Sequence, residues 1–195
     1  VIIQSGMRSI VILISGGGSN MAAIVRTAQR EDWPVHYGAQ VAAVISNRAD
    51  AGGLALAREQ GIATEVVAHG SYANRDAFDA ALAQAIDRFD HPGQPALVVL
   101  AGFMRILSAA FVSHFAGRVL NIHPSLLPLY RGTHTHERVL EAGEMEHGVS
   151  VHFVTEELDG GPVVLQAVVP VLAGDTRDVL AAHMSQQEHP IYPRA

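Results

Sequence analysis

The sequence predicts an α/β protein with a mostly parallel β-sheet and helices on both faces of that sheet. Short apolar runs alternate along the chain with longer segments whose apolar residues recur at helical spacing. Several of the runs are apolar at every position, which is typical of strands buried on both faces of a parallel sheet. Hydrophobic residues make up 49% of the 195 residues and charged residues 16%, a composition that suits a globular protein and excludes a disordered one.

Three strands and two helices are expected in the first third of the chain. Residues 10–14 form a continuous apolar run and predict the first strand. Asn20 is a good helix cap and predicts a helix over residues 20–30. Residues 41–45 predict the second strand, and Asp50 is expected to cap a helix over residues 50–58. Residues 64–67 predict a short third strand.

The middle of the chain continues this alternation. Residues 74–89 carry apolar side chains at helical spacing and predict the longest helix. Prolines and a glycine break the pattern at residues 91–95. A further buried strand is predicted over residues 96–100 and a helix over residues 108–114. Residues 119–123 predict a strand that ends in polar side chains.

The last part of the chain predicts two strands, over residues 149–154 and 163–171, and a final helix over residues 176–188. This order of strands and helices predicts a sheet that is mostly parallel. In such sheets, ligands bind beyond the carboxyl ends of the strands. Functional side chains are therefore expected directly after strands.

Composition excludes several classes of protein. The chain has no cysteine, which excludes disulfides and thiolate metal ligands. Its longest apolar run, residues 96–101, is far shorter than the roughly 20 residues that cross a bilayer. A net charge of −6 without a Lys/Arg cluster argues against nucleic-acid binding. Residues 1–6 lack the features of a signal peptide and are interpreted as an extension or remnant before a single domain over residues 7–195, which is expected to be cytoplasmic.

A glycine-rich turn, residues 15–20, follows the first predicted strand. Glycines let the backbone approach a ligand closely, and the N-terminus of the following helix favours a phosphate. The turn lacks the lysine of a Walker loop, and its spacing does not match a dinucleotide fingerprint, which disfavours a nicotinamide oxidoreductase. The alternative is a tight turn without a ligand.

Asn121 and His123 lie two residues apart at the end of a predicted strand, so their side chains share one face. Chemistry at a buried site needs a proton donor and a group that stabilises an oxyanion, and these two residue types supply both roles. The alternative is a structural pair that fixes the following loop.

Asp159 lies in a turn before two glycines and a proline, which can hold its carboxylate inward; the alternative, which is the more common case, is a solvated turn aspartate. Such a carboxylate near His123 would favour the charged form of the imidazole. Among the 11 histidines, no pair has the helical spacing of a zinc-protease motif, so no metal site is predicted. His134 and His136 are expected to shape their loop instead.

Five segments together resemble the phosphoribosylglycinamide formyltransferase family. Taken in chain order, they span nearly all of the sequence from Ile10 to Pro193. They read ISGGGSN at residues 14–20, LAGFMRILS at 100–108, NIHPSLLPLYRGTHTH at 121–136, HGVSVHFVTEELDGGPV at 147–163 and QQEHPIYP at 186–193.

The resemblance implies a Rossmann-like formyltransferase fold. It also implies transfer of a formyl group from 10-formyltetrahydrofolate, the formyl-donor cosubstrate, to the amine of glycinamide ribonucleotide in purine synthesis, without a metal. The family's catalytic residues fall on Asn121, His123 and Asp159. Its ribonucleotide contacts fall on Gly18, Ser19, Asn20 and Glu188. Its folate contacts fall on Arg75, Met104, Arg105, Ile106, Leu107, Thr155, Glu156, Glu157, Leu158 and Asp159.

The resemblance carries further expectations. Leu127–Pro128 is a candidate cis peptide. The family continues past Pro193 into further strands, so the end at Ala195 is interpreted as truncated or disordered. No nucleic acid or membrane partner is expected, and a homodimer is left open. A formyltetrahydrofolate hydrolase-like enzyme and a nonenzymatic phosphate-ligand sensor are the alternative functions.

Overall fold

The computed structural model describes residues 6–195 and divides them into two compact units. The first unit ends at Val119 and the second runs from Leu120 to Ala195. Residues 1–5, which belong to the predicted extension, lie outside the described residues. Among the described residues, no helix combines the length and the apolar character that crossing a membrane requires.

Four parallel strands form the centre of the first unit, in the spatial order β3-β2-β1-β4. Residues Ile10 to Ile14 of β1 are all buried, because β1 lies between two neighbouring strands and is covered on both faces. The strands are β1 (Arg8–Ile14), β2 (Ala39–Ser46), β3 (Ala63–Val66) and β4 (Leu97–Leu100).

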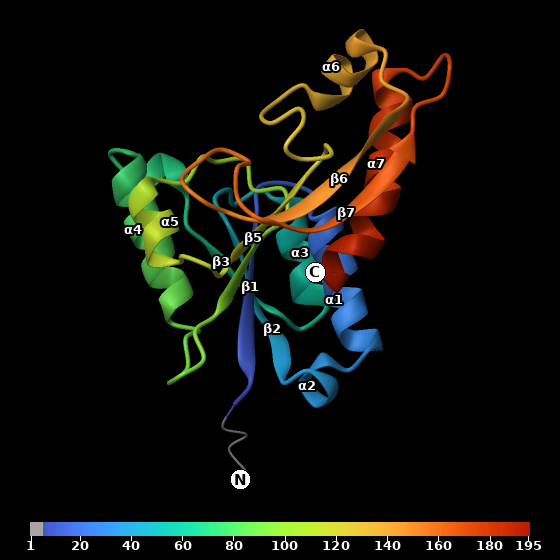
Figure 1. Cartoon of the computed structure of the whole chain (residues 1–195). Helices are drawn as coiled ribbons and strands as arrows, with labels where there is room; N and C mark the ends of the chain where they lie inside the picture. The colour runs from blue at the N-terminus through green and yellow to red at the C-terminus, as the bar shows by residue number, and fades with distance from the viewer. Residues whose placement is uncertain (1–5) are drawn as a thin grey trace. The chain divides into compact units, whose positions relative to one another are not determined.

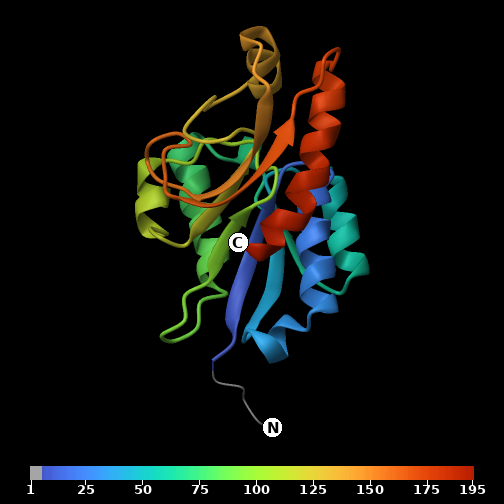
Figure 2. The ribbon, with the colours of Figure 1, turned by 45° about the vertical axis from the view of Figure 1, so that its right-hand side comes forward.

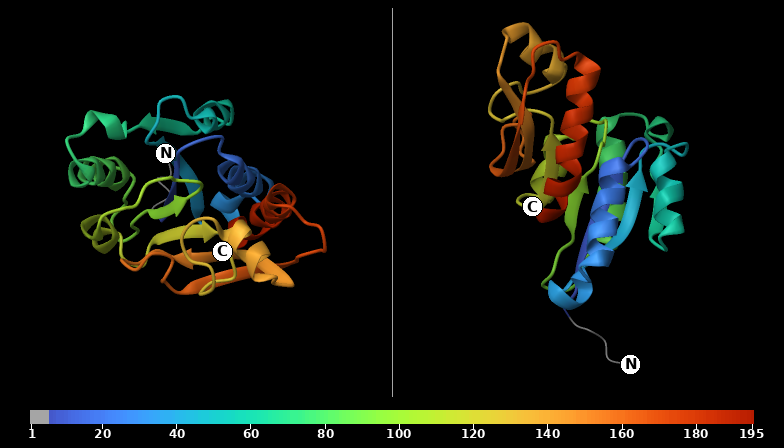
Figure 3. Two further views of the ribbon diagram at one scale, coloured as in Figure 1. Left: turned by 90° about the horizontal axis from the view of Figure 1, so that it is seen from above. Right: turned by 90° about the vertical axis from the view of Figure 1, so that its right-hand side faces the viewer.

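Helices cover both faces of these strands, as predicted. Figures 1 and 3 show α1 and α3 on one side and α4 and α5 on the other. The apolar side chains of α4, with Phe78, Leu82 and Ile86 fully buried, follow the expected helical spacing. The helices are α1 (Ser19–Arg30), α2 (Trp33–His36), α3 (Gly52–Glu59), η1 (His69–Ser71), α4 (Arg75–Asp87) and α5 (Ala109–His114).

Two of the predicted caps are wrong. Helix α1 is preceded by Gly18 in a left-handed conformation, so Asn20 lies inside the first turn rather than at the cap. Helix α3 is preceded by Ala51, while Asp50 forms an ion pair with Arg48. Neither helix has a side-chain cap, and both begin in glycine-rich turns. Side-chain capping preferences therefore do not predict where these two helices begin.

The second unit contains three antiparallel strands, β5 (Val119–His123), β6 (Glu146–Phe153) and β7 (Val163–Pro170). Helix α7 (Arg177–Ile191) contacts β6 and β7, and Figure 2 shows it running alongside them. The 3-10 turn η2 (Tyr192–Arg194) follows α7. Helix α6 (Thr135–Ala142), where a loop is predicted, packs against α7. The α/β class is confirmed; parallel pairing lies in the first unit and antiparallel pairing in the second.

Candidate active site

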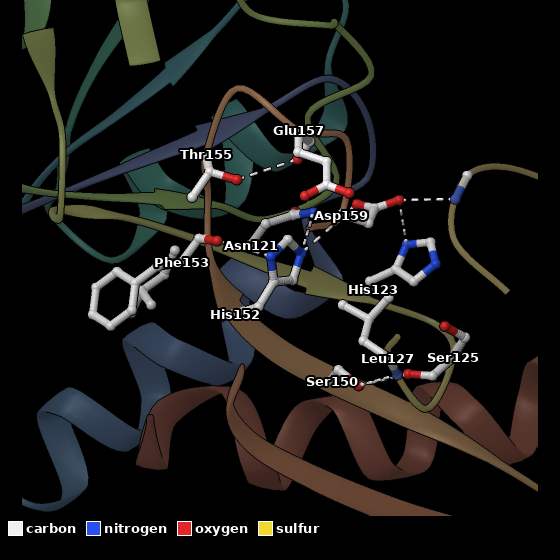
Figure 4. Close-up of polar contacts among 12 residues, drawn as sticks. Asn121, His123, Ser125, Leu127, Ser150, His152, Phe153, Thr155, Glu157 and Asp159 are labelled. Atoms are coloured by element: carbon white, nitrogen blue, oxygen red, sulfur yellow. Dashed lines mark hydrogen bonds and ion pairs between the residues drawn. The ribbon is translucent and has the colours of Figure 1, made fainter. Parts of the chain in front are cut away.

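Asn121 and His123 lie on β5, at the end of the strand, as predicted. The antiparallel register places Asn121 opposite His152 of β6 and His123 opposite Ser150. Paired residues of antiparallel strands project to the same face, so these four polar side chains gather on one side of the sheet. Figure 4 shows them together with the turn that carries Asp159.

Both ring nitrogens of His123 face oxygen atoms. The Nε2 atom lies 3.0 Å from the carbonyl oxygen of Tyr130, and the Nδ1 atom lies 3.4 Å from Oδ2 of Asp159. A carbonyl and a carboxylate only accept hydrogen bonds, so the ring satisfies both contacts when both nitrogens carry protons. The arrangement therefore suits the imidazolium form of His123.

Asp159 adopts the inward orientation expected of its turn. Its φ angle of +49° is left-handed, and its side chain is 8% exposed. The Oδ2 atom also accepts a hydrogen bond of 2.9 Å from the backbone N–H of Gly132. Gly161 permits the tight turn, because a Cβ atom there would lie 1.8 Å from the carbonyl oxygen of Phe153.

His152 is part of the same cluster, although no pattern in the sequence predicts a role for it. Its Nδ1 atom lies 3.0 Å from the carbonyl oxygen of Phe153, so Nδ1 donates and Nε2 is free to accept. The amide Nδ2 of Asn121 lies 3.4 Å from that Nε2 atom, and Oδ1 of Asp159 lies 3.7 Å from it. Burial lowers the pKa of His152, which keeps the ring neutral and able to accept from Asn121.

The loop after His123 is fixed by the hydroxyl of Ser150, which is fully buried. That hydroxyl donates to the carbonyl oxygen of Ser125 at 2.7 Å and accepts from the backbone N–H of Leu127 at 3.0 Å. It also accepts from the side-chain amide of Gln166 at 2.7 Å. The one donor position and both acceptor positions of the Ser150 hydroxyl are therefore occupied. The Leu127–Pro128 peptide bond is cis, as expected.

A pair of histidines lies in the same unit. The Nδ1 atom of His136, on α6, is 3.0 Å from Nε2 of His147, on β6. Burial lowers the pKa of His136, which the carboxylates of Glu137 and Glu188 oppose. Burial, reinforced by the neighbouring His136 ring, lowers the pKa of His147 to about 4. The charge of Glu188, on α7, therefore acts on the His136 ring.

The loop that carries Thr155 to Asp159 is exposed except at its end. Thr155 donates from its hydroxyl to the carbonyl oxygen of Glu157 at 3.3 Å, and the Glu157 carboxylate pairs with Arg131. Leu158 is 58% exposed. Glu156 is also exposed. Of the five loop residues predicted to contact folate, only Asp159 belongs to the buried cluster.

The glycine-rich turn belongs to the first unit. The N–H of Gly53 donates to the carbonyl oxygen of Gly16 at 3.0 Å, which brings two glycine-rich turns together. A Cβ atom on Gly18 would lie 2.9 Å from Cα of Gly53, so this close approach requires glycine. Ser19, the first residue of α1, is exposed, and Asn20 is buried.

The other predicted folate residues of the first unit lie between β4 and α5 and at the start of α4. Met104 and Ile106 are 78% and 68% exposed. The Arg105 guanidinium lies 5.7 Å above the Phe78 ring. Leu107 is half-buried, and Arg75 is the first residue of α4.

Two buried side chains hold the segment of residues 103–108. Ser15 accepts from the N–H of Met104 at 2.8 Å and donates to Asn47 at 2.6 Å. Asp79, itself buried, accepts from the N–H of Ser108 at 2.6 Å. The segment therefore presents two large apolar side chains from a fixed backbone. Among residues 6–195, no group of three or more His, Cys, Asp or Glu side chains is arranged to hold a metal ion.

A family model and several known proteins match nearly the whole chain. A family model described as formyl transferase matches residues 8–195. Phosphoribosylglycinamide formyltransferase of Escherichia coli is 56% identical over 185 residues, which are 95% of this chain and 84% of that protein. The trifunctional purine biosynthetic protein adenosine-3 of Bos taurus is 42% identical over 99% of this chain, which spans 18% of that longer protein.

A solved structure has the same fold. Phosphoribosylglycinamide formyltransferase from Coxiella burnetii superposes with a TM-score of 0.86 at 48% identity, over 96% of this chain and 84% of that one. The chain therefore belongs to the formyl transferase family, among the phosphoribosylglycinamide formyltransferases.

Proposed function

We propose that the protein transfers the formyl group of 10-formyltetrahydrofolate to the amine of glycinamide ribonucleotide, a step of purine synthesis. One observation supports this most directly: Asn121 and His123, whose ring is hydrogen-bonded to Tyr130, lie beside the buried carboxylate of Asp159. Family membership supports the identity of the two substrates.

In the proposed mechanism, the uncharged amine attacks the formyl carbon. The new carbon–nitrogen bond leaves a tetrahedral oxyanion, which the His123 imidazolium and the Asn121 amide stabilise by hydrogen bonding. One preorganised donor of this kind contributes roughly 10²–10³ in rate. Asp159 keeps His123 charged and passes the proton lost by the amine to N10 of the folate as the carbon–N10 bond breaks.

The binding roles belong to the same proposal. The turn at Gly18, Ser19 and Asn20 binds the ribonucleotide phosphate, because the N-terminus of a helix directs backbone N–H groups and a positive dipole end toward an anion. Glu188 binds the ribose hydroxyls. The folate contacts Arg75, the exposed segment from Met104 through Arg105 and Ile106 to Leu107, and the loop from Thr155 to Asp159. We also propose a cytoplasmic location, a single domain over residues 7–195 and no metal requirement.

The test is the absorbance change as 10-formyl-5,8-dideazafolate loses its formyl group, with and without glycinamide ribonucleotide. Turnover that depends on the ribonucleotide is the expected result. Loss of the formyl group at the same rate without ribonucleotide would identify a hydrolase-like enzyme instead. Binding of the ribonucleotide with no turnover would favour a nonenzymatic sensor.

A further inference from the structure

The backbone from Tyr130 to Thr133 contacts two of the three proposed catalytic side chains, His123 and Asp159. The carbonyl oxygen of Tyr130 accepts from Nε2 of His123, and the N–H of Gly132 donates to Oδ2 of Asp159. A shift of this short segment would therefore displace His123 and Asp159 together. The contacts that hold this segment in place are therefore important for the proposed catalytic step.

The segment has a costly backbone conformation. Tyr130 and His134 have φ angles of +54° and +57°, in the left-handed region that non-glycine residues rarely adopt. Gly132, between them, also has a positive φ angle, of +82°. Each such non-glycine residue adopts an unfavourable conformation, which persists only where surrounding contacts impose it. The segment therefore needs a brace from outside its own backbone.

Arg138, one turn into α6, makes the contacts that such a brace requires. Its Nη1 atom donates to the carbonyl oxygen of Arg131 at 2.7 Å and contacts that of Thr133 at 3.4 Å. These two carbonyls flank Gly132 on either side. Its guanidinium carbon lies 5.3 Å from the centre of the Tyr130 ring. A charged donor strengthens both kinds of contact.

Tyr130 is held at its other end as well. Its hydroxyl donates to the carboxylate of Glu144 at 2.7 Å, and this hydrogen bond raises the pKa of Tyr130. The ring is thus fixed between Glu144 and the Arg138 guanidinium. Fixing the ring fixes the residue whose carbonyl oxygen meets His123.

We propose that Arg138 is a positioning residue for catalysis: it braces the segment from Tyr130 to Thr133 and so aims His123 and Asp159 at once. The inference rests on the proposed catalytic roles of those two residues. Arg138 itself does not touch the reacting atoms. Lysine should replace it only in part, because an ammonium group can donate to the two carbonyls that Nη1 contacts but lacks the planar guanidinium that lies over the Tyr130 ring.

The test compares Arg138→Met, Arg138→Lys and wild-type protein in steady-state kinetics. Arg138→Met should lower kcat about 10-fold to 100-fold, the effect of a misplaced catalytic group. KM for each substrate should stay within about threefold, and Arg138→Lys should be intermediate. Arg30→Met removes the same charge from an exposed position in the first unit and should keep wild-type kinetics. If Arg138→Met does not fold, Arg138→Lys carries the comparison.

A spectroscopic readout separates positioning from simple loss of stability. In the wild-type protein, the proton on Nε2 of His123 is hydrogen-bonded to Tyr130 and should exchange slowly with water in a ¹H–¹⁵N experiment. In folded Arg138→Met, it should exchange faster. Unchanged exchange together with kcat within twofold of wild type would overturn the inference.

A variant of His123 keeps this inference distinguishable from the proposed function. His123→Asn should abolish most turnover if His123 is catalytic. Normal turnover of His123→Asn would refute the catalytic role itself, whatever Arg138 does. Loss of turnover in His123→Asn with full turnover in Arg138→Met would refute the positioning role alone.

Discussion

The Nδ1 atom of His123 and the Oδ2 atom of Asp159 lie 3.4 Å apart, and the two side chains are only 7% and 8% exposed. The same Asp159 oxygen accepts the N–H of Gly132. Nδ1 of His123 and the backbone N–H of Gly132 therefore both face one buried carboxylate oxygen. The pair places a carboxylate directly beside the imidazole ring.

Asp159→Asn should test this charge with little change in shape. An asparagine oxygen can still accept from Gly132, so the turn should remain intact, but the charge that favours the His123 imidazolium is lost. We expect kcat to fall by about 10²-fold or more, the usual contribution of a proton-transfer group, with much smaller changes in either KM. Asp178→Asn, at a side chain 91% exposed, is the matched control. Near-normal turnover of Asp159→Asn would remove Asp159 from the chemistry.

His152 should contribute through the orientation of Asn121. His152→Leu removes the acceptor for the Asn121 amide, whereas His152→Gln supplies a side-chain oxygen in its place. One hydrogen bond is worth about 0.5–1.5 kcal/mol, so kcat should fall about threefold to tenfold in the leucine variant. The glutamine variant should recover part of that loss. Equal kcat values in both variants would show that the acceptor does not matter.

The fold could largely be predicted from local patterns in the sequence, whereas the catalytic roles proposed for Asn121, His123 and Asp159 depend on the family resemblance and are only made plausible by those patterns. The buried strand at residues 10–14 and the polar end of the strand at residues 119–123 are visible as runs of residue types. In the Asp-Gly-Gly-Pro turn at Asp159, a Cβ atom on either glycine would collide with a residue that is nearby in the sequence, on the same loop or on the adjoining strand.

Other features depend on contacts between distant residues and left no local pattern. Helix α6 is short, begins after His134 in a left-handed conformation and packs against α7, so its stability comes from tertiary contacts. In the sequence, His152 is one of several polar residues of its strand, which also contains His147 and Ser150. Its place beside Asn121 follows from the strand register, which the sequence does not specify by itself.

Ser19→Ala should test the phosphate assignment of the glycine-rich turn. Ser19 is exposed at the first position of α1, so its removal should not disturb packing. A hydrogen bond to a charged phosphate is worth about 1.5–3 kcal/mol, which predicts a rise in ribonucleotide KM of about 10-fold to 100-fold. The folate KM should not change. Ser185→Ala, exposed on α7, serves as the control. An unchanged ribonucleotide KM would count against phosphate binding at this turn.

The His136–His147 pair should make stability depend on pH. In the folded protein the pKa of His147 is about 4, well below its unfolded value of about 6.5, so the unfolded chain binds the proton more readily. Stability is therefore complete above about pH 6.5 and is lost as pH falls from there toward 4, at up to about 1.4 kcal/mol per pH unit. Thermal unfolding followed from pH 7.5 to 4.5 measures this loss.

Replacing His147 by glutamine should flatten that dependence, because glutamine keeps a hydrogen-bonding partner for His136 but does not titrate. The variant should lose less Tm between pH 6.5 and 4.5 than the wild-type protein, even if its Tm at pH 7.5 is lower. The exposed His36→Gln variant should follow the wild-type curve. Protonation of His147 places a positive charge 3.0 Å from the half-buried His136 ring, whose pKa is also lowered, so the loss should steepen when both histidines are present. Parallel Tm curves for wild type and His147→Gln would mean that acid sensitivity arises from other groups.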